Sequence, residues 1–493
     1  MGVDFDPNQV AIPRGHFIGG AFLDLPGEAI EVLRPSDHQP LDPIRDGGEE
    51  AVGRAVEAAK TALAATRWGR MAPLERAKVL HRFADAVEAN GEYLARLEAL
   101  GSSRLISATT VRDAPRTAGV IRYYAEFCDK LEGIVTATEA DTLSYVKNEP
   151  YGVVGAVVPW NFPLITAAWK FAPALAAGNA VVMKTSELTP HSLLALAAIA
   201  VQAGLPAGLF NVVNGLGQTT GSAIVRHPDI KKISFTGSTA TGAVIMTQAA
   251  QSGMKPVTLE LGGKSPQLVF ADIDDVAATA AKVATAFIDN AGQVCTAGSR
   301  LVVQRGIAEP LLEAIEARCR AIRPGPTWEE ATSFAPIISR RQAERIDRLV
   351  RQTIAEGAQA RIGGSPLEGR NEGSFYAPTI LEGVTDDMTG FREEFFGPVL
   401  TVHRFDEMEE GLALAAHPTY GLAASVHTTD IRKALKAADE IEAGMVWVNQ
   451  HGRGPEFTFP AGGFKASGFG KDMGRAGIEA FMRQKAVWVN YAA

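Results

Sequence analysis

Between residues 153 and 261, short strand-like runs alternate with longer stretches of helical pattern. The runs "VVGAVVPW", "AVVMK", "LFNVV", "KKISF" and "PVTLEL" are rich in β-branched and apolar residues. Helical stretches such as "PLITAAWKFAPALAAGN" and "STATGAVIMTQAAQ" separate them. Strands that alternate with helices in this way predict a parallel, doubly wound sheet. Such sheets bind ligands at the carboxyl ends of their strands, so functional residues are expected there.

The rest of the chain extends this pattern in both directions. A second alternating block follows "ELGGKSP", with the runs "PQLVF", "SRLVVQ", "GPVLTVHRF", "GLAASVH" and "GMVWVN", and predicts a second α/β domain. Residues 47–129 have apolar positions three and four apart and are predicted to be helical. Residues 136–152 alternate weakly and indicate a hairpin that reaches out from the body, and "KAVWVNY" is a terminal strand. The polar stretch 363–373 is predicted to be a surface loop.

Composition narrows the classes of partner. The chain of 493 residues is long enough for two or three domains, and its charge of −8 disfavours broad nucleic-acid binding, which needs a basic face. The N-terminus lacks a signal-peptide pattern, and the longest apolar stretch is about half of a membrane span. Three widely spaced cysteines without a CxxC fit a reducing compartment and provide no thiol metal site. We therefore expect a soluble cytoplasmic protein with no metal, membrane or nucleic-acid partner.

The segment "GQVCTAGSR" places Cys295 in a loop of small residues. Cys128, in "YYAEFCDK", and Cys319, in "EAIEARCRAI", lie instead in helical apolar patterns typical of buried structural thiols. Gly292, Ala297, Gly298 and Ser299 leave space beside Cys295, so we expect another molecule to reach it. A thiol that is accessible and able to ionise is a candidate nucleophile.

Two polar residues follow strands of the first block. Glu260, in "TLELGGKSP", ends a strand between apolar neighbours. Its carboxylate is either solvated or a capping group or, if partly desolvated, has a raised pKa suited to a general base. Asn161, in "VVPWNFP", stands between a strand and a helix, where it either caps the helix or offers an amide N–H to a developing oxyanion. The residues alone leave both alternatives open in each case.

Gly237 and Ser238, in "FTGSTATG", stand at a strand-to-helix junction, where free backbone N–H groups favour a phosphate. The stretch lacks the lysine of a P-loop, and "GLGQTTG" misses the GxGxxG spacing by one residue, so neither establishes dinucleotide binding. No pair of histidines has metal spacing, and no G-x-S-x-G elbow is present. A cysteine hydrolase remains an alternative from the residues alone, but it needs a histidine partner that the sequence does not identify.

A set of motifs resembles the aldehyde dehydrogenase superfamily in order and spacing: "PWNFP", "FTGST", "LELGGKSP", "GQVCTAGSR", "EEFFGPV" and "GGFKASGFGKDMG". The resemblance runs from about residue 15 to the end of the chain. It implies an NAD(P)-dependent, non-acylating oxidation of an aldehyde to a carboxylic acid, with NAD as cofactor and NADP as the alternative. The implied fold is α/β, with two doubly wound, Rossmann-like domains and a small β extension for a homodimer or homotetramer. The implied divisions are an NAD-binding domain of residues 1–130 and 151–261, a catalytic domain of residues 262–478, and oligomerisation segments of residues 131–150 and 479–493.

The same resemblance implies roles for single residues. Cys295 matches the nucleophile, Glu260 the general base and Asn161 the oxyanion donor, with the Cys295 backbone N–H as second donor. The cofactor-binding positions are matched by Trp160, Lys184, Glu187, Gly237, Ser238, Glu394 and Phe396. The substrate-tunnel positions are matched by Phe162, Trp169 and Ala461.

One departure from the family pattern bears on the substrate. The family's C-terminal signature usually opens Pro-Phe-Gly-Gly, whereas this chain has "PAGG", with Ala461 in place of the aromatic residue. The missing ring predicts a wider tunnel and a bulky hydrophobic or aromatic aldehyde, unless Phe457 or Phe459 fills the space. Two other functions stay open: a CoA-acylating semialdehyde dehydrogenase, which Glu260 disfavours, and a non-catalytic structural protein that reuses the fold, which the retained nucleophile disfavours.

Overall fold

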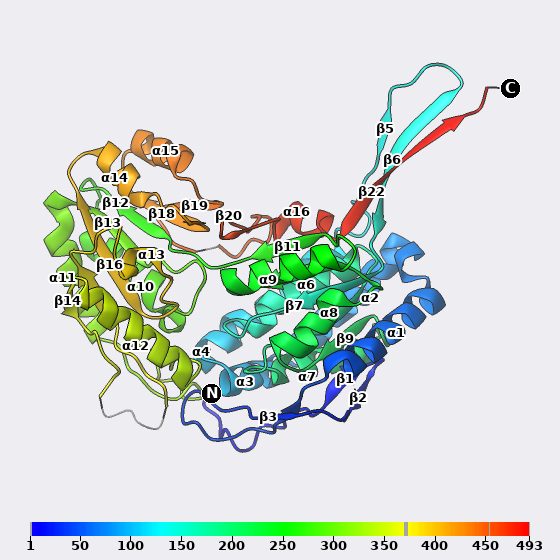
Figure 1. The fold of residues 1–493 in the computed structure, drawn as a ribbon, viewed down its shortest axis with the longest axis horizontal. Helices are drawn as coiled ribbons and strands as arrows, with labels where there is room; N and C mark the ends of the chain where they lie inside the picture. Colours follow the sequence, from blue (N-terminus) through cyan, green and yellow to red (C-terminus); the bar gives the residue numbers. More distant parts are fainter. Residues whose placement is uncertain (1, 369–372, 453, 493) are drawn as a thin grey trace.

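The computed structural model describes residues 2–368, 373–452 and 454–492. Two twisted sheets, each flanked by helices, lie next to each other, and a narrow arm of strands projects from the first (Figure 1). The surface loop predicted over residues 363–373 lies partly outside the described residues. The predicted α/β class, with two Rossmann-like units and a β extension, is confirmed.

The first sheet contains the strands predicted between residues 153 and 261, and these are mutually parallel. Their side chains are buried on both faces of the sheet, which explains why the runs are continuously apolar and do not alternate. In spatial order the strands are β9 (Phe210–Val213), β8 (Ala180–Lys184), β7 (Val153–Val157), β10 (Ile230–Thr236) and β11 (Val257–Glu260). Antiparallel strands extend the two edges: β1 (His16–Ile18) and β2 (Ala21–Leu23) on one side, and β21 (Gly468–Phe469), from far along the chain, on the other.

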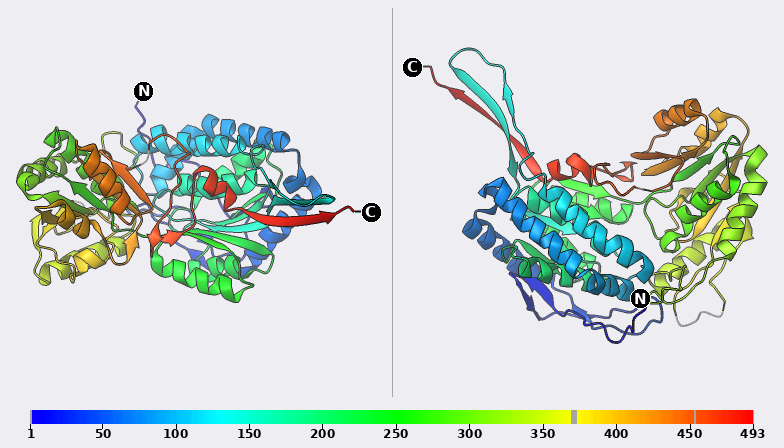
Figure 2. Two further views of the ribbon diagram at one scale, coloured as in Figure 1. Left: turned by 90° about the horizontal axis from the view of Figure 1, so that it is seen from above. Right: turned by 180° about the vertical axis from the view of Figure 1, so that it is seen from behind.

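Two groups of helices pack on this sheet (Figure 2). The first group is α6 (Pro163–Ala176) and α7 (His191–Gln202), covered by α2 (Pro73–Ala89), α3 (Gly91–Gly101) and α5 (Ala114–Ala125). The second group is α1 (Gly48–Thr66), α8 (Ser222–Arg226) and α9 (Thr239–Gln251). In α2 the buried residues Val79, Phe83 and Val87 recur every fourth position and form one apolar face. The predicted helical region over residues 47–129 is confirmed.

The second sheet is built from the predicted second block. Its spatial order is β14 (Gln359–Ile362), β15 (Thr379–Glu382), β16 (Val399–Phe405), β13 (Arg300–Gln304), β12 (Pro266–Val269), β18 (Ala423–His427) and β19 (Met445–Val448). Neighbouring strands are parallel except at β14. The flanking helices are α10 (Val276–Ile288), α11 (Ala308–Arg320), α12 (Arg340–Ala355), α14 (Met408–Ala415) and α15 (Ile431–Glu440). Helix α12 was not predicted, although its buried Ile346, Leu349, Val350 and Thr353 follow helical spacing.

Short elements complete the fold. They are β3 (Ala29–Ile30), β4 (Ile44–Arg45), α4 (Ile106–Ala108), α13 (Thr389–Arg392), β17 (Tyr420–Gly421), β20 (Phe464–Lys465) and α16 (Gly474–Glu479). A π-helical turn, Thr109–Asp113, joins α4 to α5. In the described part of the chain, no helix is long and apolar enough to cross a bilayer. The same residues hold no group of three or more His, Cys, Asp and Glu side chains that could hold a metal ion.

The predicted hairpin is present, and the last strand of the chain pairs with it. Strands β5 (Ile134–Thr136) and β6 (Thr142–Pro150) form the hairpin, and β22 (Met482–Asn490) pairs antiparallel along β6; we call this unit the arm (Figure 1). Ile134, Val135 and Trp488 are exposed on it. Free strand edges and exposed apolar side chains favour pairing with another chain. The oligomer itself stays a prediction.

Candidate active site

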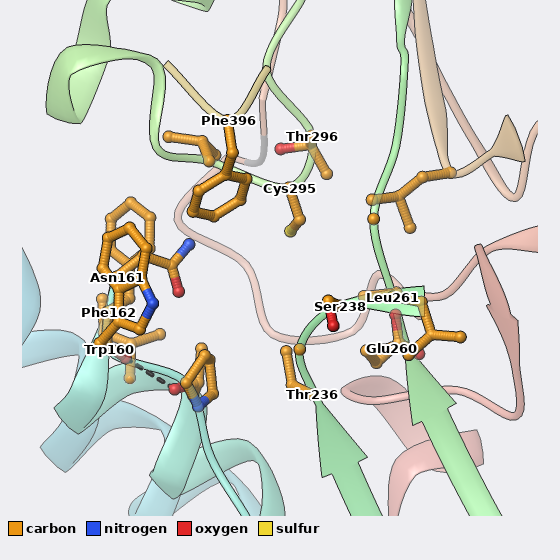
Figure 3. Close-up of a pocket in the computed structure, with 18 of the residues that line it drawn as sticks. Trp160, Asn161, Phe162, Thr236, Ser238, Glu260, Leu261, Cys295, Thr296 and Phe396 are labelled. Atoms are coloured by element: carbon orange, nitrogen blue, oxygen red, sulfur yellow. Dashed lines mark hydrogen bonds between the residues drawn. The ribbon is translucent and has the colours of Figure 1, made fainter. Parts of the chain in front are cut away.

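A cavity of about 420 Å³ lies where the carboxyl ends of the first sheet face the loop before β13 (Figure 3). Most of its lining comes from residues 159–169, 236–238, 260–262 and 294–296, and other side chains come from earlier and later in the chain. Among the predicted site residues, all of which the structure describes, Lys184 and Glu187 alone lie outside the lining. The fold therefore brings most of the predicted site together from both sheets.

Cys295 is half-buried, and its side chain faces the cavity (Figure 3). The other two cysteines are buried elsewhere: burial raises the pKa of Cys128, and it raises the pKa of Cys319 to about 12. A thiol with such a raised pKa stays protonated and unreactive at neutral pH. The predicted contrast in exposure between Cys295 and the two structural thiols is confirmed.

The loop that carries Cys295 has a strained backbone. Asn290, Ala291 and Gly292 have φ values of 52°, 51° and 71°, in the left-handed region. This conformation costs a non-glycine residue on the order of 1 kcal/mol or more. Gln293, which is fully buried, stabilises the loop: its side-chain amide donates to two backbone carbonyls at 2.9 and 3.2 Å, and its Oε1 accepts from a backbone N–H at 2.9 Å.

The small residues around Cys295 do not have the role that the sequence predicted for them. A Cβ atom on Gly292 would collide with the carbonyl of Gly397, and one on Gly298 would collide with the side chain of Gln267. The lining includes none of the four small residues, Gly292, Ala297, Gly298 and Ser299. The prediction that small residues open a path to the thiol is therefore wrong. The two glycines instead let the loop pack closely against Gly397 and Gln267. The space in front of the thiol is the cavity itself.

Asn161 lies between β7 and α6, and its side chain does not cap the helix. Phe162 occupies the cap position, and no side-chain cap bond is formed there. The Nδ2 of Asn161 donates to the backbone carbonyl of Gln293 at 3.0 Å, and the Nδ2 of Asn290 donates to the Asn161 carbonyl at 3.2 Å. The capping alternative is therefore wrong. These bonds fix the amide beside the loop of Cys295, and an amide NH₂ has a second N–H to donate.

Glu260 is the last residue of β11 and is buried on the other side of the cavity from Cys295 (Figure 3). A Cβ atom on Gly462 would lie 2.9 Å from Oε1 of Glu260, so the glycine makes room for the carboxylate. The backbone carbonyl of Glu260 accepts from the N–H of Gly237 at 3.0 Å, which ties the end of β11 to that of β10. The first sheet thus places the carboxylate of Glu260 at the cavity, and a loop of the second sheet places the thiol of Cys295 there.

Helix α9 begins at the cavity. Ser238 caps it, because the Oγ of Ser238 accepts from the N–H of Thr241 at 3.2 Å. Thr236, Gly237 and Ser238 line the cavity, so the positive end of the helix dipole faces it. The Oγ1 of Thr236 is buried and has no hydrogen-bond partner within the described residues.

Aromatic and acidic residues form a further wall beside this helix end. Trp160 and Phe396 pack edge to face with ring centroids 5.3 Å apart. Glu394 accepts from the N–H of Gly263 at 3.1 Å, and burial raises the pKa of Glu394 to about 7. A Cβ atom on Gly262 would lie 3.0 Å from the carboxyl carbon of Glu394, so the carboxylate packs directly against this glycine.

Lys184 and Glu187 lie on the same edge of the sheet, outside the lining. Lys184 ends β8, in register with Val157 of β7. Its Nζ forms an ion pair with Glu187 at 3.2 Å. Burial lowers the pKa of Lys184, and the neighbouring Glu187 carboxylate opposes this shift.

The predicted substrate residues Phe162, Trp169 and Ala461 all line the cavity. Phe162 lies just before α6 and Trp169 lies on it, and the guanidinium of Arg104 lies 4.3 Å from the centroid of the Phe162 ring. Ala461 is buried in the lining, and its backbone exchanges hydrogen bonds of 2.7 and 2.8 Å with Asp472. A wall of aromatic rings is therefore fixed, and the methyl of Ala461 adds little volume to it.

Neither candidate aromatic replaces the missing ring. Phe457 packs beside Tyr123, with centroids 5.9 Å apart, and Phe459 stacks on Trp447 at 6.4 Å. Within the described residues, neither one lines the cavity. Neither ring therefore takes the place of the missing aromatic residue in the lining beside Ala461.

Several lining residues were not predicted: Arg112, Arg116, Asp289, Gln342 and Arg345. Gln342 and Arg345 belong to the unpredicted helix α12, and Arg345 donates to the backbone carbonyls of Glu394 and Phe395 at 2.9 and 3.0 Å. The spacing of Arg112 and Arg116 shows that they share one helical face, but no pattern in the sequence shows that this face meets the cavity.

The arrangement suits addition of a thiol to a carbonyl group. The thiol of Cys295 and the amide of Asn161 face one space, so a carbonyl carbon at the sulfur can place its oxygen near an N–H donor. Glu260 offers a carboxylate on the other side. The N-terminus of α9 and the polar groups near it favour a ligand with phosphates.

Comparisons with known proteins agree with this chemistry. Residues 22–487 match the model of the aldehyde dehydrogenase family. An aldehyde dehydrogenase of Aspergillus niger is 40% identical over 98% of this chain and 96% of its own. A phenylacetaldehyde dehydrogenase of Pseudomonas fluorescens is 39% identical over 97% and 96% of the two chains. The crystal structure of an indole-3-acetaldehyde dehydrogenase with NAD⁺ superposes with a TM-score of 0.95, at 39% identity and 98% coverage of both chains.

Proposed function

The chain belongs to the aldehyde dehydrogenase family, and on this premise we propose that it oxidises an aldehyde to the carboxylic acid with NAD, through a covalent adduct on Cys295. The observation that carries the proposal is the meeting of Cys295, Asn161 and Glu260 around one cavity. These residues come from three separate parts of the chain. Because packing alone does not require a thiol, an amide and a carboxylate around one cavity, their meeting indicates a chemical role.

Addition to the aldehyde is the first step of the proposal. The Cys295 thiolate forms a C–S bond to the carbonyl carbon, and the carbonyl π electrons move to oxygen. Asn161 Nδ2 and the backbone N–H of Cys295 donate to this oxyanion. Because the bond to the Gln293 carbonyl holds the Asn161 amide in place, the donor is oriented before the substrate arrives. Loss of one such donor typically costs about 10²–10³-fold in rate.

The polar groups beside the cavity fit a dinucleotide. The N-terminus of α9 and the unpartnered Oγ1 of Thr236 suit the pyrophosphate, and Glu394 suits the hydroxyls of the nicotinamide ribose. Lys184 and Glu187 suit the adenosine ribose, with the Glu187 carboxylate repelling a 2′-phosphate and favouring NAD over NADP. Trp160, Gly237, Ser238 and Phe396 complete the proposed cofactor contacts. When bound, NAD supplies the acceptor for the hydride that leaves the adduct carbon.

Hydrolysis of the Cys295 thioester completes the cycle. Once hydride has left, the adduct oxygen is a carbonyl again and the acyl group is joined to sulfur. Glu260 takes a proton from water, the hydroxide attacks the acyl carbon, and the C–S bond breaks to release the acid and the thiolate. The buried position of Glu260 beside the cavity supports this role. A CoA-acylating reaction would replace water with a thiol at this point and would not need the carboxylate.

We further propose that the aldehyde is bulky and hydrophobic or aromatic. Phe162 and Trp169 provide aromatic walls, Ala461 contributes only a methyl group to the lining, and two of the similar proteins are named for arylacetaldehydes. Each CH₂ that fills the space contributes about 0.8 kcal/mol, or roughly fourfold in affinity. Substituting Ala461→Phe should therefore lower kcat/KM for phenylacetaldehyde more than for acetaldehyde.

A direct assay tests the function. Purified protein is mixed with NAD or NADP and with aliphatic and aromatic aldehydes, with and without CoA, and nicotinamide absorbance is recorded. We expect NADH to form without CoA, with the highest kcat/KM for aromatic aldehydes and for NAD. If no aldehyde is oxidised, or if turnover requires CoA, the proposal is wrong.

The same proposal assigns the larger units of the fold. We propose that residues 1–130 and 151–261 form the NAD-binding domain, that residues 262–478 form the catalytic domain, and that the arm, within residues 131–150 and 479–493, joins subunits in a dimer or tetramer. The exposed apolar residues of the arm support the last assignment.

A further inference from the structure

A tight turn carries Cys295 at the edge of the cavity. The N–H of Ala297 donates to the carbonyl of Val294 at 2.9 Å, so Cys295 and Thr296 are the two central residues of this turn. Both residues line the cavity (Figure 3). The buried side chain of Gln293 stabilises the chain before the turn. The carbonyl of Thr296, directly after the nucleophile, accepts a bond from a different part of the chain.

His451, which follows β19, makes this bond. Its Nε2 lies 2.7 Å from the carbonyl oxygen of Thr296, and its Nδ1 lies 3.2 Å from Oγ of Ser425, on β18. A carbonyl oxygen can only accept a hydrogen bond, so Nε2 carries the proton. Nδ1 is then the acceptor, and the hydroxyl of Ser425 is its donor. The two bonds together select one tautomer and one orientation of the ring.

The surroundings keep His451 neutral and hold its ring in place. Burial lowers the pKa of His451 to about 4, so the ring carries no charge near neutral pH. The ring packs against Trp447, with centroids 5.1 Å apart. Ser425 is fully buried and lies opposite Trp447 in the register of β18 and β19. His451 is therefore a directional donor that brings no charge to the neighbouring thiol.

The segment that carries His451 is anchored independently of the site. Asn449 has a left-handed backbone, with φ of 56°, and its side chain binds Thr428 twice. Its Oδ1 accepts from the N–H of Thr428 at 3.0 Å, and its Nδ2 donates to the carbonyl of Thr428 at 2.9 Å. Lys282, on α10, donates to the carbonyl of Asn449 at 2.9 Å. His451 thus links a fixed end of the second sheet to the turn of Cys295.

We propose that His451 is a positioning residue for the nucleophile, because its bond to the Thr296 carbonyl holds the turn of Cys295 in the geometry that addition to the aldehyde requires. The inference rests on the proposed function and adds to it a residue that lies outside the cavity lining. The backbone N–H of Cys295, the second proposed oxyanion donor, belongs to the same turn. Side-chain bonds from Gln293 before the turn and from His451 within it therefore position the sulfur and this N–H together.

Two substitutions separate the hydrogen bond of His451 from the packing of its ring. His451→Phe keeps an aromatic ring against Trp447 but has no N–H for the Thr296 carbonyl. His451→Gln loses the ring, but its amide N–H reaches about as far along the side chain as Nε2 of histidine does. Because a displacement of about 1 Å at a catalytic group can cost on the order of a hundredfold in rate, we expect kcat to fall by about tenfold or more in His451→Phe. His451→Gln should retain most of the wild-type kcat.

Three further measurements locate the effect. KM for NAD should stay unchanged in both variants, since the proposed cofactor contacts lie on other elements. The rate of alkylation of Cys295 by iodoacetamide, which needs neither NAD nor aldehyde, should fall in His451→Phe, because the sulfur is displaced from its place at the cavity. The thermal midpoint reports any general loss of stability. His81→Phe is the matched control, since His81 lies on α2 and outside the cavity lining.

The other outcomes overturn the inference or the proposed function separately. Wild-type kcat and alkylation rate in His451→Phe show that the bond to Thr296 does not position the nucleophile. Equal losses of kcat in His451→Phe and His451→Gln, or a lowered thermal midpoint that accounts for the loss, assign the ring a purely structural role and also overturn the inference. If the wild-type protein oxidises no aldehyde, the proposed function has failed, and the alkylation rates of the two variants still decide whether His451 positions Cys295.

Discussion

Substituting Gly292→Ala tests whether close packing of the loop positions Cys295. Gly292 has φ of 71°, and a Cβ atom there would collide with the carbonyl of Gly397 and lie 2.7 Å from the nitrogen of Pro398. The alanine therefore meets two penalties, one from the left-handed backbone and one from the overlap. The obstacle is backbone on both sides, so no side chain can swing away to relieve it.

The size of the effect follows from these two terms. A left-handed conformation costs alanine about 1–2 kcal/mol, and overpacking typically costs about 1–3 kcal/mol. Relief of the overlap requires either the loop of Cys295 or the segment of Gly397 to move. Because a displacement of about 1 Å at a catalytic group can cost on the order of a hundredfold in rate, we expect kcat to fall by about tenfold or more.

The measurements are kcat with NAD, the rate of alkylation of Cys295 by iodoacetamide, and the thermal midpoint. Cys128 and Cys319 are buried, so alkylation of the folded protein reports on Cys295. Gly306→Ala is the matched control, since a Cβ atom on Gly306 meets nothing within 4 Å. If Gly292→Ala retains the wild-type kcat, alkylation rate and midpoint, the loop is not positioned by this contact and the reasoning is refuted.

Three further predictions follow from the site and the arm. Cys295→Ala should abolish aldehyde oxidation while NAD still binds, as measured by quenching of protein fluorescence, whereas Cys319→Ala should stay active; appreciable turnover by Cys295→Ala would exclude the thiol as nucleophile. Glu260→Gln should give a rapid burst of NADH followed by slow turnover, because water activation follows hydride departure; an unchanged steady-state rate would exclude Glu260 as the base. Light scattering at micromolar concentration should show a dimer or tetramer, and a particle of only 52.3 kDa would contradict the role proposed for the arm.

The sequence predicted the sheets because local composition determines what a buried parallel strand can contain. Strands β7 and β8 are apolar on both faces. Their burial can therefore be predicted from their own residues, without knowing which elements pack on them. Helix α12 escaped prediction for the opposite reason. It is strongly charged, and only a narrow stripe around Ile346 and Val350 is buried, so its role as a support for the cavity depends on contacts distant in sequence.

At the site, residue identity was easier to predict than the reason for it. The glycines near Cys295 were correctly singled out, but their neighbours in the sequence could not show that Gly397 would occupy the space that a side chain needs. The alternatives for Asn161 were likewise undecidable locally, because the carbonyl that accepts its amide belongs to Gln293, in the loop before β13. That loop holds both the thiol and the acceptor that orients Asn161, so a displacement of the loop would move the nucleophile and its oxyanion donor together. The positions of the Cys295 thiol and the Asn161 amide are therefore coupled through this loop, and the coupling depends on a contact between residues far apart in the sequence.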